Sequence, residues 1–206
     1  MADASTQMID AAERIVAESG FAAMTVSAVQ QAAGQGNKSA VQYHFGDRDG
    51  LIRAVLDARM APANDRRMAM LERLEPGCSL RDLVEVYVLP SAESVQSREP
   101  SYWARFLLQA VSDPKVGHSA MESVQSEAFR TVQQLLLERL DHVPAELRAS
   151  RVGGAFGYVC TALAAYEVSG GPEGVDDDTL NAELVDACVG LLAGPSSLAA
   201  DTPGSS

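Results

Sequence analysis

Cysteines, aromatic residues and long hydrophobic runs are all scarce in this sequence of 206 residues. Its cysteines, Cys78, Cys160 and Cys188, are odd in number and widely spaced, which argues against a disulfide framework and against a zinc site. No run of about 18 apolar residues occurs, so we expect no membrane span. The first residues have neither the basic start nor the apolar segment of a secretory signal. These absences predict a protein of the reducing cytoplasm, with the cysteines on helices as small apolar residues.

Catalytic patterns and strand patterns are missing as well. The sequence has no nucleophile–base pair, no metal-ligand spacing and no phosphate-binding glycine loop. We therefore predict no enzyme activity, no catalytic or metal-binding residues and no cofactor. Alternation typical of β-strands is also absent, whereas apolar residues recur at helical spacing over most of the chain. The predicted fold class is all-α, and we expect Pro62 to open or kink a helix and Pro90 to interrupt one.

Residues 25–45 carry the most informative pattern, which is typical of two short helices joined by a tight turn. Thr25 offers an oxygen that can cap the first helix, and Gly34 and Gly36 allow a sharp change of direction. Asn37 can cap the second helix. Helical spacing gives the first helix an apolar stripe of Val26, Val29, Ala32 and Ala33.

The second of these helices has one inner face and one outer face. Val41 and Phe45 lie four residues apart and are expected to face inward. We expect His44 to pack and bond locally, and Tyr43 either to contact DNA or to be an ordinary half-buried aromatic residue. A short helix with a polar outer face fits the major groove of DNA. The residues expected to point outward are Ser39, Ala40, Gln42 and Tyr43.

Sequence elements around this pattern narrow its interpretation. They are Gly20-Phe21, Thr25-Val26, Ala33-Gly34, Tyr43-His44-Phe45 and Gly50-Leu51-Ile52. Together these elements resemble the DNA-binding domain of the TetR (tetracycline repressor) family. The resemblance implies a three-helix helix-turn-helix domain followed by a larger helical domain for ligand binding and dimerisation.

The resemblance also implies which residues meet the DNA. Lys38 and Arg48 fall at helix starts, where phosphate contacts are made. Gln42 stands where the family commonly has an aromatic residue, Arg48 where it has lysine, and the turn Gly-Gln-Gly-Asn is one residue longer than usual. The predicted DNA-binding residues are Thr25, Asn37, Lys38, Ser39, Ala40, Gln42, Tyr43 and Arg48.

The charge of the chain is unusual for a DNA-binding protein. The formal net charge is −12, and residues 1–60 contain five basic and seven acidic residues. This segment is therefore nearly neutral, which weakens the electrostatic attraction to DNA that such a domain normally has. We expect modest non-specific binding and greater reliance on shape and base contacts.

The remaining chain divides into a helical domain, residues 61–194, and a flexible tail, residues 195–206. The helix expected at residues 144–169 is rich in small residues, and glycine inside a helix suggests close approach of another backbone. Two such terminal helices from each of two chains would form a four-helix bundle about a two-fold axis. Alternatively, these helices only close the core of one protomer. The predicted dimer interface comprises Gly153, Phe156, Gly157, Leu184, Cys188 and Leu191.

The middle helices supply a predicted pocket for a small-molecule inducer, which the sequence does not identify. Aromatic and methionine side chains make adaptable apolar walls, although aromatics at helical spacing are equally consistent with plain core. The excess of acidic residues in this domain favours neutral or cationic ligands over strong anions. The predicted ligand-binding residues are Tyr87, Trp103, Phe106 and Met121.

The sequence thus predicts a DNA-binding transcriptional regulator, in particular a homodimeric repressor that reads a palindromic operator of double-stranded DNA and is released by a ligand. The alternative is a helical ligand- or protein-binding module without DNA function. The near-neutral first domain is the best support for that alternative.

Overall fold

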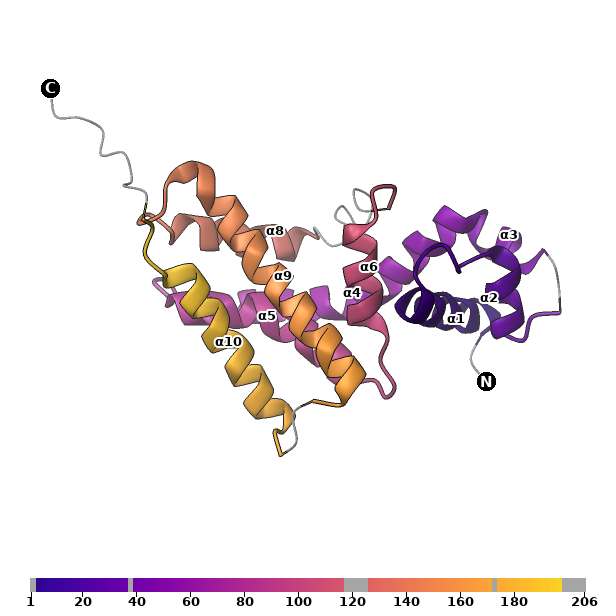
Figure 1. Cartoon of the computed structure of the whole chain (residues 1–206). Coiled ribbons are helices and arrows are strands. Elements are labelled where there is room, and N and C mark those ends of the chain that lie inside the picture. The colour runs from indigo at the N-terminus through magenta and orange to yellow at the C-terminus, as the bar shows by residue number, and fades with distance from the viewer. Residues whose placement is uncertain (1–2, 37–38, 117–125, 172–173, 198–206) are drawn as a thin grey trace, which may run out of the picture.

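The computed structural model describes residues 3–36, 39–116, 126–171 and 174–197, and every regular element in these ranges is a helix. The first four are α1 (Ala4–Ser19), α2 (Val26–Ala32), α3 (Ala40–Phe45) and α4 (Arg48–Leu71). The next three are α5 (Leu80–Gln96), α6 (Trp103–Ser112) and α8 (Glu127–Glu138). The last two are α9 (Ala145–Ser169) and α10 (Asp177–Ala193). The all-α prediction is confirmed, and α1, α2 and α3 gather at one end of the molecule (Figure 1).

The first domain is built on the apolar face of α1. Met8, Ala12 and Val16 recur on this face and are buried, and Gly20 ends the helix with a positive φ of 75°. The apolar stripe predicted for α2 is partly wrong. Val29 is buried, but Val26 is exposed, because so short a helix turns only one narrow face to the core.

Helix α4 joins the two domains as one continuous element. It runs through Pro62, and the predicted boundary between residues 60 and 61 falls inside it. Pro90 likewise lies inside α5 and does not interrupt it. A proline removes one helical hydrogen bond, but buried residues on both sides of Pro62 and Pro90 pack against the core and keep each helix continuous.

The second domain encloses an aromatic cluster. Tyr87 of α5 stacks on Phe129 of α8, with ring centroids 5.1 Å apart, and Phe156 of α9 packs against both rings. Cys160 and Cys188 are buried on α9 and α10, and burial raises the pKa of the Cys160 thiol to about 12 and that of Cys188 to about 11. Cys78, which we predicted on a helix, lies in the loop between α4 and α5.

None of the helices in the described ranges is both long enough and apolar enough to cross a membrane.

Candidate DNA-binding surface and its connection to the second domain

The N-terminal end of α2 is fixed by its cap. The Thr25 hydroxyl accepts a hydrogen bond from the Ala28 backbone N–H at 3.1 Å, which satisfies one of the free donors at the helix start. Helix α3 follows after a loop and begins at Ala40, directly after the exposed Ser39. Two predicted DNA contacts, Asn37 and Lys38, lie outside the residues that the structure describes.

Helix α3 presents a polar and aromatic outer face. Gln42, Tyr43 and His44 are exposed, and Tyr43 retains 83% of its accessible surface. The His44 ring stands edge-on to the Tyr43 ring, with centroids 5.0 Å apart. His44 was expected to pack and bond locally, and sequence reasoning left it out of this face. We define the outer face of α3 as Gln42, Tyr43 and His44.

The predicted outward position of Ala40 is wrong. Its accessible surface is only 6%, and it packs into the core beside Val41. As the first residue of α3, Ala40 lies where the helix starts against the rest of the domain, so its methyl group closes the core and does not face solvent.

Arg48 has a structural role in the first domain. Its guanidinium donates to the carbonyl of Phe21 at 2.7 Å and to that of Met24 at 3.0 Å, and it lies 5.8 Å from the centre of the Phe21 ring. The predicted phosphate contact is not supported by this geometry, because these bonds hold the start of α4 to the segment between α1 and α2. Sequence spacing could not show this fold-back, since the partners are more than twenty residues away.

Two other cations lie near the start of α4. Arg53, on α4, and Lys115, from the segment after α6, are exposed and line one hollow of about 170 Å³ together with Arg48. Lys115 belongs to the second domain by sequence, so the charge count over residues 1–60 did not include it. The fold brings Lys115 to the first domain, where the acidic Asp49 lines the same hollow.

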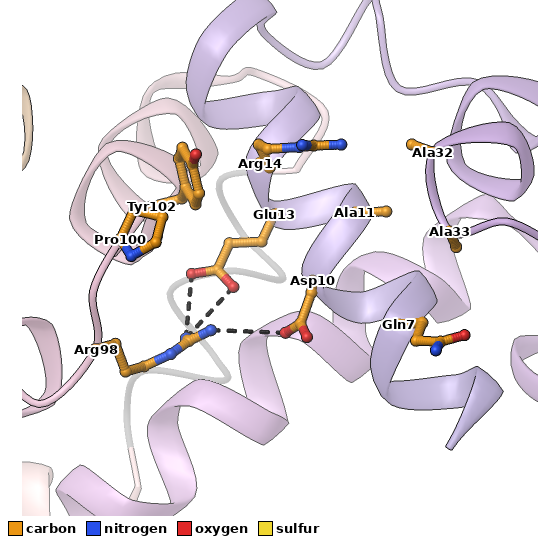
Figure 2. A pocket seen from close by; sticks show the side chains of 10 residues that line it. All are labelled: Gln7, Asp10, Ala11, Glu13, Arg14, Ala32, Ala33, Arg98, Pro100 and Tyr102. Carbon is orange, nitrogen blue, oxygen red and sulfur yellow. Dashed lines mark hydrogen bonds and ion pairs between the residues drawn. The ribbon is translucent and has the colours of Figure 1, made fainter. Parts of the chain in front are cut away.

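An ion cluster around the buried Glu13 carboxylate connects α1 to the second domain. Glu13 has 1% of its surface exposed and pairs with Arg59 of α4 at 2.6 Å and with Arg98 at 3.4 Å. Asp10 pairs with the same two arginines. Burial raises the pKa of the Glu13 carboxyl, while the two arginines act in the opposite direction. Figure 2 shows Arg98 reaching from the segment after α5 toward both acids, at the wall of an open hollow of about 470 Å³ that Tyr102 also lines.

Aromatic contacts run alongside this cluster. Trp103 stacks on Phe106 within α6 at 5.8 Å, and the Phe106 ring stands edge-on to Phe21 of the first domain at 5.7 Å. The Arg48 guanidinium in turn lies over the Phe21 ring. The middle helices therefore touch the residues that hold the start of α4.

The predicted ligand-binding residues are not gathered around one ready-made pocket. Tyr87 lies in the aromatic cluster with Phe129 and Phe156, whereas Trp103 and Phe106 pack together on α6. Trp103 lines a cavity of only about 10 Å³, which has room for about one water molecule. The fourth predicted residue, Met121, is outside the described ranges.

The predicted dimer residues divide into two groups. Phe156, Leu184 and Cys188 are buried inside the protomer, so their assignment to an interface is corrected. They occupy the inner faces of α9 and α10, which pack on each other and on the core. Gly153, Gly157 and Leu191 are exposed.

The outer face of α9 and α10 carries exposed glycines and apolar side chains. Most of the large exposed hydrophobic residues in the described ranges lie on these helices or between them, including Val168 at 72% and Leu191 at 47%. A groove of about 580 Å³ runs between the two helices, and Gly154 and Tyr158 are among its walls. A side-chain carbon added at Gly153, Gly154 or Gly157 would meet no atom within 4 Å in the protomer.

Comparison with known proteins gives a family match for the first domain. Residues 8–55 match the family model described as bacterial regulatory proteins, tetR family. No curated protein sequence matches the chain.

Solved structures resemble the fold over nearly the whole chain. A fatty acid degradation regulator, FadR from Bacillus halodurans, is 17% identical with a TM-score of 0.66, covering 93% of this chain and 99% of its own. A TetR variant from Acinetobacter baumannii AYE in complex with minocycline is 18% identical with a TM-score of 0.54 (94% and 96% covered). NalD, the secondary repressor of the MexAB-OprM multidrug efflux pump in Pseudomonas aeruginosa, is 17% identical with a TM-score of 0.56 (94% and 98%). At these identities the likeness establishes the fold.

Proposed function

We propose that this chain, whose residues 8–55 match the family model for bacterial regulatory proteins of the tetR family, is a DNA-binding transcriptional regulator, and that it acts as a homodimeric repressor that a small molecule releases from a palindromic operator. The protein would act in the cytoplasm, on operator DNA. The observation that carries this proposal is the outer face of α3, which exposes large polar and aromatic side chains to solvent.

The outer face of α3 is suited to a major groove. Gln42 can form two hydrogen bonds with the edge of an adenine, and the exposed Tyr43 ring can reach a phosphate or a base. Arg53 and Lys115, which lie near the start of α4, supply charge for phosphate contacts. Because the cations are few, base contacts and shape must supply much of the specificity.

Dimerisation would use the outer face of α9 and α10. Helix interiors rarely retain glycine without a reason, since each costs about 1 kcal/mol relative to alanine, and nothing in the protomer occupies the space beside Gly153 and Gly157. A second copy of the same face, related by a two-fold axis, would fill this space and cover the exposed Leu191 and Val168. Two α3 helices would then read two symmetric half-sites.

Release by a ligand would act through α6 and α1. A molecule bound in the second domain that shifts α6 would move Phe106 against Phe21 and strain the Glu13 cluster. Release is only as strong as the preference of the ligand for the non-binding shape, typically about 1–3 kcal/mol. Two structurally similar proteins support this role by their descriptions, one as a complex with minocycline and one as a repressor of an efflux pump.

The decisive experiment is a gel shift with the DNA upstream of the gene, followed by selection of binding sequences from a random library. The parent protein should select a symmetric sequence. Gln42→Ala should relax the preference at one position in each half-site and cost about 1–3 kcal/mol there. Met68→Ala, an exposed residue of α4 in the second domain, is the matched control and should bind as the parent does.

Two outcomes would contradict the proposal. A parent protein that selects no sequence would favour the helical module without DNA function, and selection unaffected by changes at both Gln42 and Tyr43 would show that α3 is not the reading helix.

A further inference from the structure

Arg67 of α4 is the largest fully buried side chain in the described ranges. Its guanidinium donates to the carbonyl of Val86 at 3.3 Å, to Asn64 Oδ1 at 2.9 Å and to Ser91 Oγ at 3.3 Å. It also lies 5.0 Å from the centre of the Phe129 ring. All of these neighbours are electrically neutral.

No carboxylate within the described ranges forms an ion pair with Arg67. The contrast with its neighbour is direct, because Arg66 pairs with Glu93 at the surface at 2.8 Å. Burial lowers the pKa of Arg67 to about 10, so the guanidinium still carries its charge at neutral pH. Buried charges are normally paired, because an unpaired one loses its hydration without compensation. The chain has 28 acidic residues, yet none of those in the described ranges pairs with Arg67.

The guanidinium lies at the edge of the aromatic interior of the second domain. Ser91, which accepts one of its hydrogen bonds, also lines the small cavity beside Trp103 and Phe156. Phe129, under the guanidinium, packs against Phe156 with ring centroids 5.0 Å apart. The positively charged guanidinium of Arg67 is therefore linked through Ser91 and Phe129 to the apolar interior.

We propose that Arg67 is the receptor for a monoanionic inducer, a carboxylate joined to an apolar body. This inference rests on the proposed function, because it assigns the ligand class of a regulator that a small molecule releases. The carboxylate accepts hydrogen bonds from the guanidinium, which has five N–H donors and uses three in the bonds above. The apolar body lies along Phe129, Phe156 and Trp103.

The charge balance selects this class. One guanidinium neutralises one negative charge, whereas a phosphate dianion would leave a net charge in the interior. The negative net charge of the chain sets a long-range field that disfavours strong anions, whereas the buried contacts of Arg67 decide the local preference. The cavity of about 10 Å³ is smaller than any such ligand. Binding must therefore move Trp103 or Phe156, and a displaced Trp103 acts directly on the Phe106–Phe21 contact.

The test compares carboxylates with neutral amides of the same shape. Octanoate, decanoate and hydrocinnamate are titrated into the full-length protein, each alongside its primary amide, and binding is followed by Trp103 fluorescence. The parent should bind at least one carboxylate about tenfold more tightly than its amide, because a charge-assisted hydrogen bond is about twice as strong as a neutral one. Arg67→Met should abolish this preference, and Arg67→Lys, which keeps the charge but not the fork, should retain part of it.

The proposed site would be overturned if the parent protein bound no carboxylate in the panel or bound the amides equally well. It would also be overturned if a folded Arg67→Met protein kept the preference for carboxylates. The comparison within the parent decides the matter even where the variants do not fold. Glu122→Gln, which removes the acid within residues 117–125, should leave the preference unchanged. A large gain in carboxylate affinity in this variant would identify a partner for Arg67 within the chain and overturn the site.

Adding the same probes to the operator complex separates the two proposals. Carboxylate binding that depends on Arg67 but leaves the operator bound supports the site and contradicts the inducer function. Release of the operator by an amide as readily as by its carboxylate supports the function and contradicts the site.

Discussion

Replacing Gly153 and Gly157 by alanine should move protomer stability and dimer affinity in opposite directions. The two glycines lie four residues apart on one exposed face of α9, and an added methyl group meets no atom within 4 Å in the protomer. Alanine is favoured over glycine in a helix by about 0.8–1.0 kcal/mol per residue, so the double variant should stabilise an isolated protomer by about 2 kcal/mol. For a chain of this length, that corresponds to a rise in Tm of about 4–8 °C.

The same double variant should weaken the dimer. If the same face packs closely against a second copy, the added methyl groups overfill the contact, at a cost of about 1–3 kcal/mol. The dimer dissociation constant should rise about 5- to 150-fold.

Sedimentation velocity over a dilution series measures the dissociation constant, and thermal denaturation at each concentration measures stability. Thr131→Ala is the control, because it raises helix propensity at an exposed position of α8, away from this face. A double variant that dimerises as tightly as the parent would refute the reasoning, as would a parent that is monomeric at micromolar concentration.

Three further predictions concern the first domain and its contacts. Arg48→Ala removes hydrogen bonds to two backbone carbonyls and should lower the free energy of unfolding by about 1–3 kcal/mol. The folded variant should keep the salt dependence of operator binding. A flatter salt dependence would show that Arg48 does contact phosphate. Lys115→Ala should leave thermal stability unchanged and weaken binding to all DNA sequences alike, with a salt slope smaller by about 1; an unchanged slope would remove Lys115 from the DNA surface. Because burial raises the pKa of Glu13 above 4.5, the stability it contributes is present below that pH and is lost as pH rises through the raised pKa. Glu13→Gln should therefore flatten this part of the pH–stability curve in urea titrations, and an identical curve would show that Glu13 does not govern it.

Much of the first domain was accessible from sequence because its signals are local. The Thr25 cap, the helical spacing of Met8, Ala12 and Val16, and the stop at Gly20 each depend on residues within one or two turns of a helix. Such patterns act before any tertiary contact forms, so they can be recognised without one. The same reasoning placed Gln42 and Tyr43 on an exposed face, where the structure has them.

Positions at the edge of a pattern were less secure. Ala40 fits either face of a short helix by spacing alone, and only the packing of α3 against the domain buries it. Phe156, Leu184 and Cys188 followed the same apolar seams as a dimer interface would, yet the folded protomer uses these seams for its own core. Periodicity identifies an apolar face but does not say which partner covers it.

The sequence by itself determined an all-helical chain with a helix-turn-helix start, because helix periods, caps and turns are written in neighbouring residues. Only the tertiary structure decided the tasks of the charged side chains. Arg48 turns back to Phe21 and Met24, Glu13 meets Arg98 from a segment 85 residues away, and Arg67 is buried among neutral groups. The physical reason is that a charge is stabilised or left unpaired by whatever the fold brings within a few ångströms of it, and those neighbours come from distant parts of the chain.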